Sequence, residues 1–151
     1  MVDLQILTSK QFELLKLWSK GLSLSEIASK LNISRQAAHK GIQVAEAKVY
    51  KALTSTAKAN KIVITEVDAR KGVLKGKSPG LETTVYITFS PANGVQVWFE
   101  REGNCEKCPF LDDCRRILLE EAKERGISLS EEEKRYLPTD LARNLFRRLG
   151  W

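Results

Sequence analysis

The feature of this sequence that most constrains its fold is a long segment of helix-favouring residues that nothing interrupts. From Ile42 to Asn60 there is no glycine or proline, and five alanines in that segment favour helix. A helix that runs from Arg35 to Asn60 would be about 39 Å long. Since a compact three-helix unit has no room for such a helix, we expect its second half to pack against another part of the molecule.

One side of this helix carries a narrow stripe of apolar and small residues, of the kind that forms a coiled-coil seam. Its members recur at alternating spacings of three and four residues: Ile42, Ala45, Val49, Ala52 and Thr56. The small residues would let another helix approach closely. Two partners are open at this point. One is the same helix of a second subunit, which would make the protein a homodimer, and the other is an internal element such as the C-terminal helices.

Two shorter helices with clear start and stop signals precede the long one. Thr8 is suited to N-cap the first helix, and Ser23 followed by Glu26 has the capping-box spacing that begins the second. Asn32 then breaks the helical pattern, and Ser34 caps the long helix. A short helix, a tight turn and a further helix that begins with polar residues together indicate a helix-turn-helix.

After Lys61 the pattern changes from helical to alternating, which indicates strands. Strands are predicted at residues 61–67, 83–89 and 95–99, and the last two are joined by the hairpin signal of residues 90–94. Residues 70–82 contain three glycines, a proline and several basic side chains, so we interpret them as a loop or an irregular hairpin. Such a small sheet is stable only when helices cover one of its faces.

The last third of the chain is helical again. Asp112 and Asp113 supply an N-cap and first turn for a helix that ends near Arg125, and Ser130 has the spacing to begin a further helix. The last helix is predicted at Asp140–Leu149. The expected fold class is therefore α+β. It comprises a helix-turn-helix domain with a long third helix (1–60), a small three-stranded antiparallel sheet (61–103), and a Cys-cluster loop with C-terminal helices (104–151).

The positive charge of the chain is concentrated at one end. There are 25 Lys and Arg residues against 19 Asp and Glu, and the whole excess of six lies within residues 1–61. A local surplus of this kind indicates a polyanionic partner. No apolar run approaches the roughly 18–20 residues of a membrane span, and the N-terminus lacks the pattern of a secretory signal. We therefore expect a cytoplasmic protein that does not enter a membrane.

A family resemblance covers the first third of the chain. The stretch LTSKQFELLKLWSKGLSLSEIASKLNIS, residues 7–34, resembles the helix-turn-helix of LuxR-type regulators and of sigma-factor region 4. The continuation SRQAAHKGIQVAEAKVYKAL, residues 34–53, is more similar to the archaeal Tfx-type transcriptional regulators. The resemblance implies sequence-specific binding of double-stranded DNA and control of transcription, and it implies nothing about residues 61–151.

The residue types at the start of the long helix suit a DNA major groove. Ala38 and Ile42 must face the preceding helices, which turns a set of polar side chains outward. Arginine pairs with guanine and glutamine with adenine through two hydrogen bonds each, so base edges are assigned to Arg35, Gln36, His39 and Gln43. Phosphates are assigned to Ser34, Lys40, Lys48 and Lys51. Gly41 is predicted to leave room for close approach to the DNA.

Three cysteines, Cys105, Cys108 and Cys114, form a C-x2-C-P-x4-C cluster within ten residues. Close to a positive helix N-terminus, such thiols should have lowered pKa values and should favour metal ligation. The motif is similar to elements of several iron–sulfur proteins, which normally have a fourth cysteine. Here Asp112, Asp113, a glutamate, solvent or a second subunit would have to replace it. Zinc, a disulfide from Cys114 to Cys105 or Cys108, and unpartnered thiols are the alternatives.

No arrangement of residues indicates an enzyme. The single histidine lies on the predicted DNA-reading face, so we do not expect a Ser-His-Asp or Cys-His pair, and there is no P-loop or dinucleotide-type glycine run. A nuclease lacks support because no Asp/Glu cluster lies outside the capping turns. The main alternative to a DNA-binding regulator is an adaptor that uses the helix-turn-helix to bind proteins of the transcription machinery.

Overall fold

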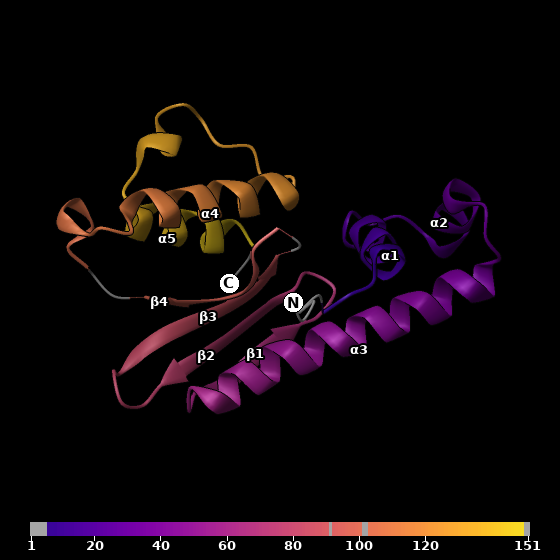
Figure 1. Cartoon of the computed structure of the whole chain (residues 1–151), viewed down its shortest axis with the longest axis horizontal. Coiled ribbons are helices and arrows are strands. Elements are labelled where there is room, and N and C mark those ends of the chain that lie inside the picture. Colours follow the sequence, from indigo (N-terminus) through magenta and orange to yellow (C-terminus); the bar gives the residue numbers. More distant parts are fainter. Residues whose placement is uncertain (1–5, 91, 101–102, 150–151) are drawn as a thin grey trace, which may run out of the picture.

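The computed structural model of the chain describes residues 6–90, 92–100 and 103–149. It is an α+β structure in which a four-stranded antiparallel sheet lies between two layers of helices (Figure 1). The long helix α3 lies along one face of the sheet, and α4 and α5 cover the other (Figure 1). No helix among the described residues is long and apolar enough to cross a membrane.

The N-terminal helices begin and end where the capping signals place them. They are α1 (Ser9–Ser19), α2 (Leu24–Leu31) and α3 (Arg35–Ala59). Both Thr8 and Ser23 form complete capping boxes, with Gln11 and Glu26 respectively as the reciprocal partners. Asn32 adopts the left-handed conformation that ends α2, with a φ of 53°. The predicted starts of these helices are confirmed, and each has a capping hydrogen bond between residues three apart.

The sheet has four strands, so the prediction of three was wrong. They are β1 (Val63–Asp68), β2 (Val73–Ser78), β3 (Thr83–Ser90) and β4 (Gly94–Phe99), in that spatial order. The additional strand β2 lies in the segment interpreted as a loop. Its Val73 and Leu74 are buried, and its Gly76 lies so close to β1 that a Cβ there would be 2.5 Å from the Val63 carbonyl oxygen. The glycine that indicated a loop therefore permits close strand pairing.

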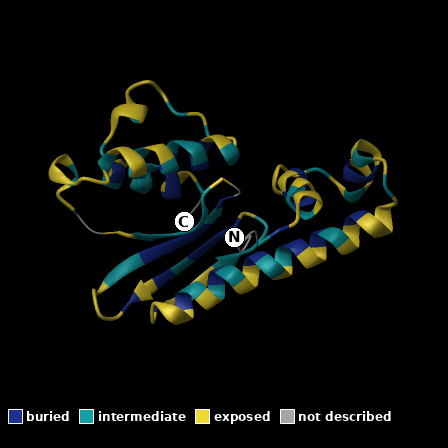
Figure 2. Cartoon of the chain, in the orientation of Figure 1, coloured by how far each residue is buried: buried dark blue, intermediate teal, exposed yellow. Residues whose placement is uncertain are grey.

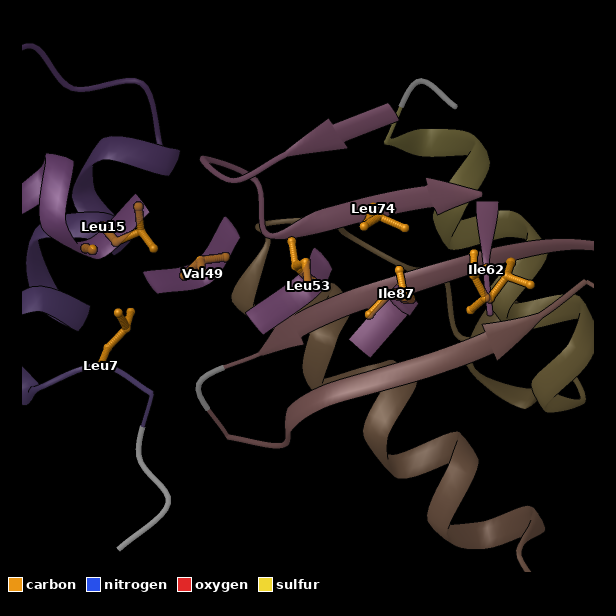
Figure 3. Packing of buried hydrophobic residues seen from close by; sticks show 10 residues of the cluster. Leu7, Leu15, Val49, Leu53, Ile62, Leu74 and Ile87 are labelled. Carbon is orange, nitrogen blue, oxygen red and sulfur yellow. The ribbon is translucent and has the colours of Figure 1, made fainter. Parts of the chain in front are cut away.

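The second half of α3 packs on the sheet. Figure 2 shows buried positions recurring along the whole of α3. The buried residues are Ala38, Ile42, Ala45, Val49, Leu53 and Ala57, and Ala52 and Thr56 are half-buried. Val49 and Leu53 belong to one hydrophobic cluster with Leu74 and Ile87 of the central strands, as Figure 3 shows. The predicted seam thus has internal partners, which are the helix-turn-helix core at Ile42 and the sheet farther along the helix, and not the C-terminal helices.

The C-terminal segment forms two α-helices, α4 (Leu111–Glu124) and α5 (Pro138–Arg148), and two single 3₁₀ turns at Cys105–Lys107 and Glu133–Arg135. The helix predicted to start at Ser130 is only such a turn, although its capping-box bonds with Glu133 are formed at 2.9 and 3.1 Å. The turn ends at Arg135 because Tyr136 is already extended, with a ψ of 151°. Pro138 in addition keeps Leu137 out of the helical region. This proline begins α5 two residues before the predicted start, and α4 begins at Leu111 without a side-chain cap from Asp112.

The face of the sheet under α4 and α5 combines aromatic packing with a buried carboxylate. Tyr86 of β3 stacks on Phe146 of α5 with ring centroids 4.3 Å apart. Two positions along the same strand, the Thr88 hydroxyl donates a 2.6 Å hydrogen bond to Glu121 of α4, and both side chains are fully buried. These contacts attach the C-terminal helices to the centre of the sheet.

Candidate nucleic-acid interface

A small core fixes the orientation of the first half of α3. Ile27 of α2 packs with Ala38 and Ile42 of α3 in a cluster that also includes residues of α1. The Ser34 hydroxyl accepts a hydrogen bond from the Ala37 amide at 3.0 Å and so caps the helix. Because Ala38 and Ile42 are buried, the opposite side of the first two turns of α3 must face solvent.

The side chains predicted to read base edges are all exposed: Arg35, Gln36, His39 and Gln43. Lys40, which is assigned to phosphates, is exposed as well. At 100° per residue these five side chains span about 140° of the helix circumference, a single face that a groove could receive. Sequence reasoning did not single out Lys30, which is exposed in the last turn of α2, next to the turn. The signal for it was available, because the helix before the recognition helix crosses the DNA backbone.

The two further lysines assigned to phosphates lie elsewhere. Lys48 is half-buried, and its ammonium group donates a 2.8 Å hydrogen bond to Gln11 in the capping box of α1. Lys51 is exposed, but it lies about 24 Å along the helix from Arg35. The structure therefore does not bring Lys48 or Lys51 together with the residues at the start of α3.

In the structure, Gly41 lies where α1 and α3 pack against each other. A Cβ at this position would lie 2.4 Å from the Leu14 Cδ1 of α1. The glycine therefore allows α1 and α3 to pack closely. The prediction that it leaves room for DNA stays a prediction.

The three cysteines are unpaired thiols in the structure. The Cys105 sulfur lies 3.1 Å from the Thr139 hydroxyl of α5, Cys108 is exposed and Cys114 is half-buried. Burial raises the pKa of Cys114, and the neighbouring groups Cys108, Cys105 and Asp113 raise it further. The expected lowering of the pKa is therefore wrong for Cys114. Within the described residues, no three His, Cys, Asp or Glu side chains are placed to hold a metal ion.

Comparison with known proteins supports the N-terminal unit alone. Residues 3–68 match a helix-turn-helix family. That family is described as "Putative helix-turn-helix protein, YlxM / p13 like", and the match covers less than half of the chain, from before α1 to the end of β1. No curated protein and no solved structure matches the chain. The helix-turn-helix prediction is thus supported, and the finer resemblance to Tfx-type regulators stays a prediction.

A tryptophan at the end of α1 connects this helix-turn-helix unit to the rest of the molecule. The Trp18 indole N–H donates a 2.7 Å hydrogen bond to the Glu46 carboxylate of α3. Arg70, in the turn between β1 and β2, donates from Nε to the Trp18 carbonyl at 2.9 Å and lies over the indole ring. Sequence reasoning missed these residues, because the contacts join positions 28 and 52 residues apart.

Proposed function

We propose that this protein is a sequence-specific DNA-binding transcriptional regulator that inserts the first two turns of α3 into the major groove. The observation that carries the proposal is the exposed face of Arg35, Gln36, His39 and Gln43 on a helix whose opposite side is buried in the helix-turn-helix core. The helix-turn-helix match of residues 3–68 supports the same function.

The chemistry of this face suits base recognition. The Arg35 guanidinium can pair with guanine, and the Gln36 and Gln43 amides can each pair with adenine. Ser34, the N-terminus of α3 and Lys40 supply donors and positive charge for phosphates. The excess positive charge of residues 1–61 would favour such phosphate contacts. The affinity for DNA should then fall steeply as the salt concentration rises.

We propose further that the protein binds as a homodimer. Support comes from apolar side chains that are exposed on two elements: Val44 and Tyr50 of α3, and Val63 and Ile64 of β1. The strand β1 is at the edge of the sheet. A two-fold dimer predicts two half-sites about one helical turn of DNA apart, or a multiple of that.

The test is selection of duplexes from a random-sequence library with the full chain, followed by binding measurements on the selected site. Replacing Arg35 or Gln36 with Ala should cost about 1–3 kcal/mol per lost base contact on that site. Binding to unrelated duplexes should change little. Lys58→Ala, an exposed charge near the far end of α3, is the matched control and should leave base discrimination intact.

The opposite results favour the adaptor interpretation. If no sequence is enriched, and if proteins of the transcription machinery bind the wild-type chain and the Arg35→Ala and Gln36→Ala variants equally, the groove-reading proposal fails. The helix-turn-helix would then be a protein-binding module.

A second part of the proposal is that the cysteine cluster senses metal or redox state. It is supported by three unpaired thiols within ten residues. Cys105 and Cys108 are close enough to Cys114 to raise its pKa. An iron–sulfur cluster or zinc would be the cofactor, and a disulfide would be the redox alternative. Protein purified without oxygen should contain stoichiometric iron with a broad visible band, or zinc. Metal-free, colourless protein whose thiols stay free in air would refute this part.

A further inference from the structure

A cleft of about 740 Å³ separates the helix-turn-helix unit from the C-terminal helices. Its walls are α1 and the C-terminal end of α4, which face one another in Figure 1. Its floor is formed by residues near the start of β2 and the end of β3. The apolar lining comes mainly from Phe12, Leu15 and Phe89. A volume of this size is typical of sites for small organic molecules.

The charged side chains around the cleft are predominantly positive. Six are cationic and two are anionic, and the chain itself engages both carboxylates. Glu124 accepts hydrogen bonds from the Ser90 hydroxyl at 2.6 Å and from the Ala92 amide at 3.2 Å. Glu120 accepts from the Asn93 amide at 2.8 Å and pairs with Arg116. Neither anion is therefore paired with a lysine of the cleft.

Most of the cations, in contrast, have no partner. Four lysines of the cleft are exposed and make no side-chain hydrogen bond or ion pair within the described residues: Lys16, Lys20, Lys71 and Lys123. The C-terminal ends of α1 and α4 also face the cleft, and each contributes about half a negative charge. Six cationic side chains against two carboxylates and about one unit of negative charge from the helix ends leave the lining with a net charge of about +3.

Arg70 provides a fixed anchor in the cleft. Its Nε is held by the Trp18 carbonyl and its guanidinium plane lies over the Trp18 ring. The two terminal nitrogens make no hydrogen bond within the described part of the chain, so they can form the paired hydrogen bonds that a carboxylate or phosphate accepts. On the other side of the cleft, the Arg125 guanidinium donates hydrogen bonds to the backbone carbonyls of Lys71, Gly72 and Phe89. These bonds hold the backbone of the floor in place.

We propose that this cleft binds a small organic anion: a carboxylate or phosphate attached to an apolar body about the size of one or two rings. The apolar body would lie on Phe12, Leu15 and Phe89, and the anionic group would pair with Arg70 and the lysines. This goes beyond the proposed DNA binding, which uses α3. Because the cleft is bounded by both the helix-turn-helix unit and the C-terminal helices, its occupant contacts the two parts at once.

The test uses two fluorescent probes that share one apolar body. The first, 8-anilinonaphthalene-1-sulfonate, carries a charge, and the second, N-phenyl-1-naphthylamine, lacks it. Titrated into the full chain without DNA, the charged probe should bind saturably with one molecule per chain. The uncharged probe should bind about tenfold or more weakly, because it cannot pair with Arg70 and the lysines.

Variants locate the probe. The double replacement Lys20→Ala and Lys123→Ala should weaken binding of the charged probe by roughly three- to tenfold and leave the uncharged probe unaffected. The matched control is Lys10→Ala with Lys58→Ala, which removes two exposed lysines that do not line the cleft. Ser19→Phe, which places a ring in the cleft from the last turn of α1, should abolish binding of both probes while the circular dichroism spectrum is retained.

The proposal is overturned if the two probes bind equally, if more than one probe binds per chain, or if the double lysine variant binds like its control. It is also overturned if duplex DNA displaces the probe, since the cleft would then be part of the DNA surface. Because probe binding is measured without DNA, a failure here leaves the DNA-binding proposal untouched, and the reverse also holds.

Discussion

The guanidinium carbon of Arg70 lies 3.9 Å from the centroid of the Trp18 ring, and the Arg70 Nε donates a 2.9 Å hydrogen bond to the Trp18 carbonyl. The arginine belongs to the turn between β1 and β2, and the tryptophan belongs to the last turn of α1. Since the Trp18 indole also bonds to Glu46 of α3, a single aromatic residue joins the first helix, the long helix and the sheet. This contact helps to hold the helix-turn-helix unit against the sheet, together with the apolar cluster in which Leu15 packs with residues of the sheet.

Replacing Arg70 with Ala should therefore destabilise the protein. A cation–π contact and a hydrogen bond to a backbone carbonyl contribute about 1 kcal/mol each, so we expect a loss of about 1–2 kcal/mol in the free energy of unfolding. Urea unfolding followed by circular dichroism measures it. Lys71→Ala, an exposed neighbour without such contacts, should stay within about 0.5 kcal/mol of the wild type. Equal losses in the two variants would show that Arg70 does not hold the unit in place.

Glu121 should make stability depend on pH in an unusual direction. Its Oε2 has no hydrogen-bond partner and lies 3.7 Å from the Arg125 Nε, and burial raises the pKa of Glu121 above 4.5 despite this neighbour. In that range the folded state binds more protons than the unfolded state. The contribution of Glu121 to stability is therefore present below about pH 4.5 and is lost as the pH rises toward the folded pKa.

The variant Glu121→Gln isolates this contribution, because glutamine has nearly the same shape and does not titrate. Thermal unfolding of the variant and the wild type between pH 4 and pH 8 measures the difference. The variant should gain stability relative to the wild type as the pH rises, by about 1.4 kcal/mol for each pH unit that separates the two pKa values. A relative loss with rising pH would mean that Arg125 lowers the pKa of Glu121 instead.

Gly76 should tolerate no side chain, because β1 lies directly against it. A Cβ there would be 2.5 Å from the Val63 carbonyl oxygen and 2.6 Å from the Ile62 Cγ2. Gly76→Ala should therefore lower the free energy of unfolding by about 1–3 kcal/mol, as overpacking does elsewhere. Gly80→Ala is the matched control, since no atom lies within 4 Å of its Cβ position. Similar urea midpoints for the two variants would contradict the observed pairing of β1 with β2.

The three thiols should react at different rates. Cys108 is exposed, whereas Cys114 is half-buried and burial raises its pKa, so a smaller fraction of Cys114 is thiolate at neutral pH. In variants that keep one cysteine each, Cys108 should react with a disulfide reagent roughly three- to tenfold faster than Cys114 at pH 7.5. Faster reaction of Cys114 would indicate that the positive end of α4 dominates its environment, as the sequence had led us to expect.

The parts of the fold that the sequence predicts are those built from short-range contacts. Thr8, Ser23 and Ser34 begin their helices through bonds to residues three positions away. The length of α3 follows equally from the helix-favouring residues along it. The exposed face at the start of α3 could be deduced as well, since burying Ala38 and Ile42 determines what faces outward.

The strand β2 and the partner of α3 could not be predicted in the same way. Strand β2 exists because its neighbours β1 and β3 pair with it, although its own residues favour a loop. The apolar stripe on α3 indicated that this side of the helix is buried, but not which element covers it. The hydrophobic effect has no preferred direction, so a sheet covers such a stripe as well as a helix does. Ser130 has the capping signal of a helix, but the segment forms only a single turn, because Tyr136 is already extended.

What the sequence by itself determined, then, is the helix-turn-helix and the chemistry of its outer face, because capping bonds and helical periodicity act within a few residues. The tertiary structure decided the rest: the pairing of β2, the burial of Glu121, the contact of Arg70 with Trp18 and the cleft beside it. Each of these joins residues far apart in the chain, and the Arg70–Trp18 bond alone spans 52 positions. Such contacts form only when the whole chain folds and long-range burial outweighs the entropy of closing the intervening loops.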